Sequence, residues 1–158
     1  SQHTLPRLLK QLQIDGVKLG FLLIDGDHTA RGVKADIAGL LDYVPSCPLY
    51  VILHDSFNPD VREGIRTADW SRNSHVHSVE IDFIPGVLHQ GGEAHREMWG
   101  GFGLALLHPE KRNGDLAISA RKEALFRAVI RHSVHWLFDP PTLTKRAARK
   151  LGNLIGMK

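Results

Sequence analysis

Two short, continuous apolar runs, at positions 21–24 and 49–53, dominate the hydrophobic pattern of the chain. Continuous runs of this length, each followed by polar and turn-forming residues, are typical of strands buried in a parallel sheet. Between them, positions 30–43 carry apolar residues at the spacing of an amphipathic helix. The pattern therefore predicts a strand over 19–24, a helix, and a second strand, joined by a right-handed crossover.

The rest of the chain continues this alternation of helices and strands. Thr4 is a good N-cap for a first helix, and Pro59 is well placed to open a later one. Strands that alternate with helices predict an α/β fold with a mostly parallel sheet, and the last two strands predict an antiparallel strand near one edge. The further predicted elements are helices over 4–15, 59–70 and 120–136, strands over 76–83 and 102–107, and a loop over 85–97.

Composition adds limits on the class of protein. The 158 residues, 42% hydrophobic and 23% charged, fit one globular domain. The net charge of +3 is too small to indicate nucleic-acid binding by itself. No apolar run approaches the roughly 20 residues that span a bilayer. We therefore do not expect nucleic-acid or membrane binding.

Cysteine usage bears on the compartment and on metal chemistry. Cys47 is the only cysteine, so an internal disulfide is excluded and a reducing, cytoplasmic setting is expected. The first residues, Ser1-Gln-His-Thr4, do not resemble a signal peptide. A metal site in this chain would have to use mainly oxygen and imidazole ligands.

Polar side chains follow both of the buried runs. Asp25 and Asp27 come directly after the first strand, and His54 and Asp55 after the second. Because the carboxyl ends of parallel strands meet at one edge of a sheet, these groups can share a site. One or two carboxylates are the usual protein ligands of Mg²⁺, whereas the His54 imidazole favours a transition metal.

Structural roles compete with this interpretation. Asp27 or Thr29 can simply cap the helix that begins near Ala30. Asp55 can form a local turn through its side chain. The presence of polar groups at both strand ends favours a shared site, and there Asp27 would be a workable general base.

Two motifs in this region resemble those of class I S-adenosylmethionine-dependent methyltransferases. They are the Ile24-Asp-Gly-Asp-His28 strand end with its following Gly-Val-Lys-Ala-Asp36 helix, and His54-Asp-Ser56 after the next strand. The closest branch is the small-molecule O-methyltransferase and cephalosporin-hydroxylase-like group. The segment 1–8 also resembles the stretch after the third strand in catechol-type O-methyltransferases. The resemblance covers roughly 1–107.

The resemblance implies roles for several residues at the strand ends. Asp25 and Asp55 would be metal ligands. His54 stands where metal-dependent relatives often carry an acidic residue, and the residues themselves make its imidazole a third candidate ligand. Asp27 matches a position proposed as the general base in sugar O-methyltransferases and would be the catalytic residue.

The resemblance also implies a cofactor site and a domain. Ser1 and Gln2 would contact the adenine of S-adenosylmethionine, and Asp25 and His28 would lie at the cofactor. The fold would be a Rossmann-like sheet, the C-terminal part of a class I methyltransferase fold, in a partial domain over 1–138. A basic amphipathic tail over 139–158 would follow it.

One departure from the family pattern is large. The glycine-rich loop that follows the family's first strand does not occur in this sequence. Gly91-Gly92 and Gly100-Gly101 do not replace it, because neither pair has a strand–loop–helix context. We therefore expect the isolated chain to bind S-adenosylmethionine poorly or not at all.

The expected function is metal-assisted O-methylation of a small-molecule acceptor, with S-adenosylmethionine and a divalent ion, Mg²⁺ being the first candidate. A homo-oligomer is compatible with the sequence. Two alternatives remain open. One is a non-catalytic remnant or interaction domain on the same scaffold, which the missing loop favours. The other is a metal-dependent hydrolase or hydroxylase that uses the same acidic edge.

Overall fold

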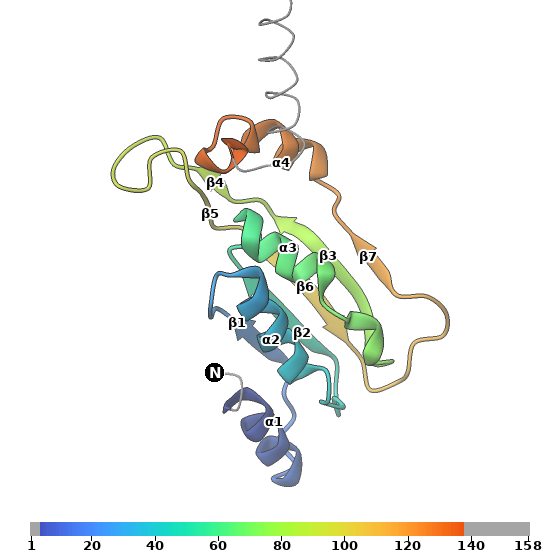
Figure 1. Cartoon of the computed structure of the whole chain (residues 1–158). Coiled ribbons are helices and arrows are strands. Elements are labelled where there is room, and N and C mark those ends of the chain that lie inside the picture. Colours follow the sequence, from blue (N-terminus) through green and yellow to red (C-terminus); the bar gives the residue numbers. More distant parts are fainter. Residues whose placement is uncertain (1–3, 138–158) are drawn as a thin grey trace, which may run out of the picture.

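A five-stranded sheet forms the centre of the computed structural model, which describes residues 4–137 (Figure 1). The strands lie in the order β1-β2-β6-β3-β7, and four of them run in the same direction. Their bounds are Phe21–Ile24 (β1), Leu49–His54 (β2), Val76–Ile84 (β3), Phe102–Leu107 (β6) and Ala117–Ser119 (β7). The predicted α/β class with a mostly parallel sheet is confirmed.

The antiparallel strand lies inside this sheet, not near an edge as the sequence predicted. β6 pairs antiparallel with β2 on one side and with β3 on the other. The chain turns back after β3 and enters the space between β2 and β3. There β6 buries Ala105 and Leu107 completely. The short, mostly exposed strand β7, which the sequence analysis missed, then extends the sheet beyond β3.

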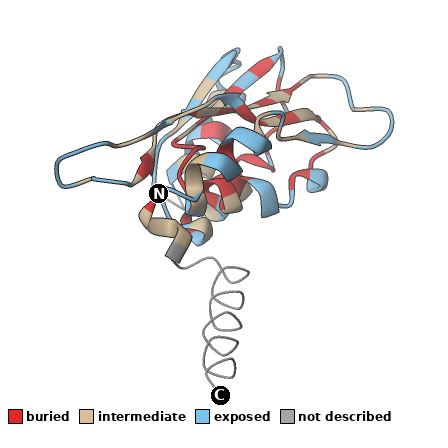
Figure 2. Ribbon diagram, turned by 90° about the horizontal axis from the view of Figure 1, so that it is seen from above, coloured by how far each residue is buried: buried red, intermediate tan, exposed pale blue. Residues whose placement is uncertain are grey.

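Helices α2 and α3 pack against each other and against one face of the sheet (Figures 1 and 2). The predicted helix over 59–70 ends earlier, as α3, and a separate 3₁₀ turn follows it. The predicted helix over 120–136 is also divided, into α4 and a second 3₁₀ turn. The bounds are Thr4–Ile14 (α1), Ala30–Leu40 (α2), Pro59–Thr67 (α3), Glu123–Ile130 (α4), Trp70–Arg72 (η1) and Val134–Leu137 (η2). No helix in this part of the chain is long and apolar enough to cross a membrane.

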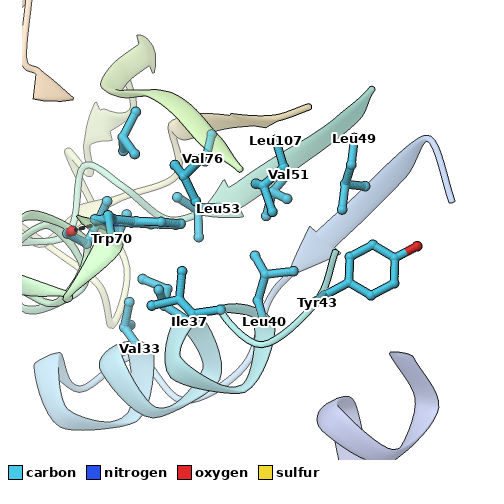
Figure 3. Packing of buried hydrophobic residues seen from close by; sticks show 14 of the residues in the cluster. Val33, Ile37, Leu40, Tyr43, Leu49, Val51, Leu53, Trp70, Val76 and Leu107 are labelled. Carbon is cyan, nitrogen blue, oxygen red and sulfur yellow. Dashed lines mark hydrogen bonds between the residues drawn. The ribbon is translucent and has the colours of Figure 1, made fainter. Parts of the chain in front are cut away.

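The main hydrophobic core lies between α2 and the sheet (Figure 3). Ile37 and Leu40 of α2 are fully buried against Leu49 and Val51 of β2. Alternate residues of a strand point to opposite faces, so Tyr50, between these two, lies on the other face and is exposed. This core fixes the ends of β1 and β2 relative to α2.

A second, smaller core joins the predicted loop over 85–97 to the body of the protein. Strand β4 (Val87–Leu88) lies in this segment and forms a hairpin with β5 (Met98–Trp99), which follows the segment directly. Met98 is fully buried there with Phe57 and Phe126. The hairpin is therefore anchored between the segment after β2 and helix α4.

Acidic side chains that tie β7 to β3 and α4 to α3 make stability depend on pH. Burial by itself raises the pKa of the Glu80 carboxyl. Hydrogen bonds from Ser119 Oγ (2.6 Å) and from the N–H groups of Arg121 and Asp82, with the charge of Arg121, lower it below its usual range. The pKa of Glu123 is also lowered, because hydrogen bonds from two arginines outweigh its burial.

We expect the free energy of unfolding to decrease as acid protonates these two carboxylates. A carboxyl whose pKa is lower in the folded state contributes its full stabilisation of the fold when the pH is above its unfolded-state pKa, ordinarily 4.5 for glutamate. That stabilisation is lost as the pH falls through the folded value. Urea unfolding over a pH series would measure it, and Glu80→Gln should flatten the acid limb. Glu110→Gln, at an exposed position, should leave the limb unchanged. Equal curves for all three proteins would contradict this explanation.

Candidate metal centre

Four polar side chains meet where β1 and β2 end. Asp25 and His28 follow β1, whereas His54 closes β2 and Asp55 follows it. The two strands are parallel neighbours, with Ile24 paired to Leu53, so their ends lie at the same edge of the sheet. One ligand atom from each of the four side chains lies within 4.8 Å of the others.

The four atoms form a closed ring in which imidazole nitrogens and carboxylate oxygens alternate. His28 Nε2 lies 2.9 Å from Asp55 Oδ2 and 3.6 Å from Asp25 Oδ1. His54 Nδ1 lies 3.1 Å and 3.2 Å from the same two oxygens. We call this set the His–Asp ring. Such a set of donors can hold a metal ion. Without a metal, imidazole N–H groups can donate to the carboxylates.

Asp55 has the most constrained position in the ring. It is only 5% exposed and adopts a left-handed backbone conformation with φ of 55°. Its backbone oxygen accepts a bond from the Asn58 N–H (2.8 Å), which makes a turn. Of its side-chain oxygens, Oδ1 accepts the distant Gly100 N–H at 2.6 Å, and Oδ2 faces the ring.

The contact with Gly100 depends on the Trp99-Gly-Gly turn. Gly100 and Gly101 have φ values of +72° and +79°, which favour glycine. A Cβ on Gly101 would lie 2.7 Å from the backbone nitrogen of Gly86, so the chain segments touch here. The turn brings Trp99 edge-to-face against His28, with ring centroids 5.3 Å apart. The indole N–H is bonded to Glu97 at 2.6 Å.

Asp27 lies outside the His–Asp ring. Its Oδ1 accepts the Thr29 N–H (2.9 Å), and its side chain fills the space over Gly32, where a Cβ would be 2.3 Å from Asp27 Cγ. Thr29 is the N-cap of α2, accepting the Gly32 N–H. This arrangement favours the capping interpretation of the segment. Asp27 still borders the pocket that Asp25, His28 and His54 also line.

The remaining predicted site residues, Ser1 and Gln2, lie outside the described residues, as does the basic tail over 139–158. The role of His28 as a member of the ring was not expected. A signal for it existed, because a histidine three residues after Asp25 can turn back toward the strand end. Its partner Asp55, however, is distant in sequence.

Comparisons of the chain with protein-family models, curated proteins and solved structures gave no significant match.

Proposed function

We propose that the chain acts as an S-adenosylmethionine-dependent methyltransferase on the hydroxyl of a small molecule, assisted by a divalent metal ion. The observation that carries the proposal is that the two motifs that resemble those of class I methyltransferases lie side by side in the structure. Ile24–His28 and His54–Ser56 end adjacent parallel strands and together supply the whole His–Asp ring. The proposal includes a Rossmann-like fold of the class I methyltransferase type.

Each group in this proposal has a defined task. A metal ion held by Asp25, His54 and Asp55 would position and acidify the acceptor hydroxyl, and S-adenosylmethionine would supply the methyl group. Asp27 would take the hydroxyl proton at the carboxylate oxygen that the Thr29 N–H leaves free. Methyl transfer to the acceptor oxygen would break the carbon–sulfur bond and leave S-adenosylhomocysteine.

The environment of the ring suits this chemistry. Trp99 packs on His28, and Phe102 packs on His54 at 5.3 Å between ring centroids. These aromatic rings place apolar surface beside the polar groups, the usual combination in a small-molecule site. We therefore propose that the binding partner of the protein is a small-molecule acceptor of the methyl group. Because Cys47 is the only cysteine, we place the protein in a reducing compartment, the cytoplasm.

A second function is favoured by one specific observation, the two imidazoles in the ring. Two histidines with a carboxylate and open positions are typical of transition-metal enzymes that activate water or oxygen. The same residues could therefore serve a metal-dependent hydrolase or hydroxylase. That enzyme would need no S-adenosylmethionine.

Calorimetric titration with S-adenosylhomocysteine, with and without a divalent metal, separates these functions. We expect weak, saturable binding that strengthens with metal and disappears in Asp25→Ala. Asp42→Ala, which removes an exposed carboxylate of the Arg72 ion pair, should bind as the parent does. Metal binding without S-adenosylhomocysteine binding would favour the hydrolase or hydroxylase. A folded protein that binds neither would contradict both and favour an interaction domain.

A further inference from the structure

We propose that His28 is a fourth metal ligand and that the complete His–Asp ring selects a first-row transition-metal ion such as Zn²⁺ or Co²⁺ over Mg²⁺. The sequence motifs predict a site of Asp25, His54 and Asp55, with Mg²⁺ as the first candidate. The structure adds a second imidazole to that set. This inference concerns metal binding alone, so it stands or fails separately from methyl transfer.

The size of the ring fits an ion at its centre. Metal bonds of about 2.0–2.2 Å to imidazole nitrogen and carboxylate oxygen separate neighbouring donors by about 2.8–3.6 Å, for angles between square and tetrahedral. The four sides of the ring measure 2.9, 3.1, 3.2 and 3.6 Å. An ion can therefore contact all four donors with little movement of the side chains.

The donor types determine which ion is preferred. Mg²⁺ binds oxygen in near-ideal octahedral geometry and keeps most of its water. Imidazole nitrogen instead suits zinc, copper, iron and nickel. Half of the ring donors are imidazole nitrogens, which Mg²⁺ would have to accept in place of water. The two carboxylates balance the charge of a divalent ion, and two neutral imidazoles add none.

Contacts outside the ring hold its members in place. Gly100 N–H fixes Asp55 through the oxygen that does not face the ring, and aromatic rings pack on both imidazoles. Such supporting contacts orient metal ligands before the ion arrives. The side chains of Asp25 and His28 are 48% and 42% exposed, so one side of the ring is open to solvent. An open side is what a catalytic metal needs for water or substrate.

The direct test is a cobalt titration of the purified chain, monitored by visible absorption. We expect saturation at one Co²⁺ per chain, displacement by an equimolar amount of Zn²⁺, and no displacement by a large excess of Mg²⁺. Zn²⁺ should also raise the melting temperature, since an ion that binds only the folded state stabilises it. Absence of a cobalt spectrum together with an unchanged melting temperature would overturn the proposal, as would displacement by Mg²⁺.

Matched variants test the membership of the ring. His28→Gln and Asp25→Asn should each weaken Zn²⁺ binding at least about tenfold. Asp27→Asn removes a neighbouring carboxylate but keeps an oxygen for the Thr29 N–H, so it should bind Zn²⁺ as the parent does. His132→Gln removes an exposed imidazole elsewhere and should also be neutral. Unchanged Zn²⁺ affinity in folded His28→Gln would show that His28 is not a ligand. If that variant did not fold, the cobalt titration of the parent would still decide, since the intensity of its spectrum reports the coordination number and the lack of displacement by Mg²⁺ reports the selectivity.

Discussion

Replacing Arg62 with alanine should lower the free energy of unfolding by about 3–5 kcal/mol, the cost of removing one partner from a buried ion pair. Arg62 is 4% exposed and Asp82 is 3% exposed. The guanidinium bonds to both oxygens of Asp82 and, through Nη2, to Glu123 Oε2 at 2.6 Å. Alanine would leave the Asp82 carboxylate buried with, among the residues that the structure describes, only the Lys122 N–H bonded to it.

The effect should be large because this network joins three elements. Arg62 belongs to α3, Asp82 to β3 and Glu123 to α4. Burial alone would lower the pKa of Arg62, but the bonds to the two carboxylates raise it, so the guanidinium keeps its charge. It also lies 4.3 Å from the centre of the Phe126 ring, in the small core that anchors the hairpin. Loss of Arg62 therefore weakens the attachment of α4 as well.

Arg66→Ala is the matched control for this prediction. Arg66 lies one turn further along the same helix and pairs with Glu63, but its side chain is 60% exposed. An exposed pair contributes at most about 1 kcal/mol. Urea unfolding of the two variants should therefore give clearly different midpoints. Equal losses in both would mean that the Arg62 network does not stabilise the fold.

The sequence predicted correctly those helices and strands that the spacing of apolar residues within a short segment determines. The continuous apolar runs of β1 and β2 and the helical spacing of α2 predicted their types correctly, and the polar residues after the strands proved to be neighbours in space. The position of β6 could not be predicted in this way. Its pairing with β2 joins Leu49 to Leu107, residues far apart in the chain, and nothing local in either segment encodes it.

Strand β3 shows a second limit of pattern reading. Simple alternation places His77, Val79, Ile81 and Phe83 on one face, yet Phe83 is exposed and Asp82 is buried. The pairing of β3 with β6 shifts register between Val76 and Ser78 and again between Glu80 and Ile84. Such irregularities change which residues face the core. This shift turns Asp82 inward to meet Arg62, so the buried ion pair could not be foreseen.

The second large effect is expected for Gly86→Ala, which should lower the free energy of unfolding by about 3 kcal/mol and weaken metal binding. A Cβ at this position would lie 2.2 Å from the Trp99 carbonyl oxygen and 2.7 Å from the Gly100 carbonyl carbon. These are backbone atoms, so the clash cannot be relieved by rotating a side chain. Forcing extra volume into a packed site typically costs about 1–3 kcal/mol, and more where the surroundings cannot move.

We expect metal affinity to fall because the displaced backbone includes the Gly100 N–H, which bonds to Asp55 of the ring. Moving Trp99 and Gly100 away from Gly86 would draw the Gly100 N–H from Asp55 Oδ1, which it meets at 2.6 Å. Asp55 would then lose the bond that directs its other oxygen into the ring. Gly91→Ala, in the same hairpin but with nothing within 4 Å of its Cβ position, should keep both stability and Zn²⁺ affinity. If Gly86→Ala binds Zn²⁺ as tightly as Gly91→Ala, the hairpin does not support the ring, and the orientation of Asp55 comes from its own turn.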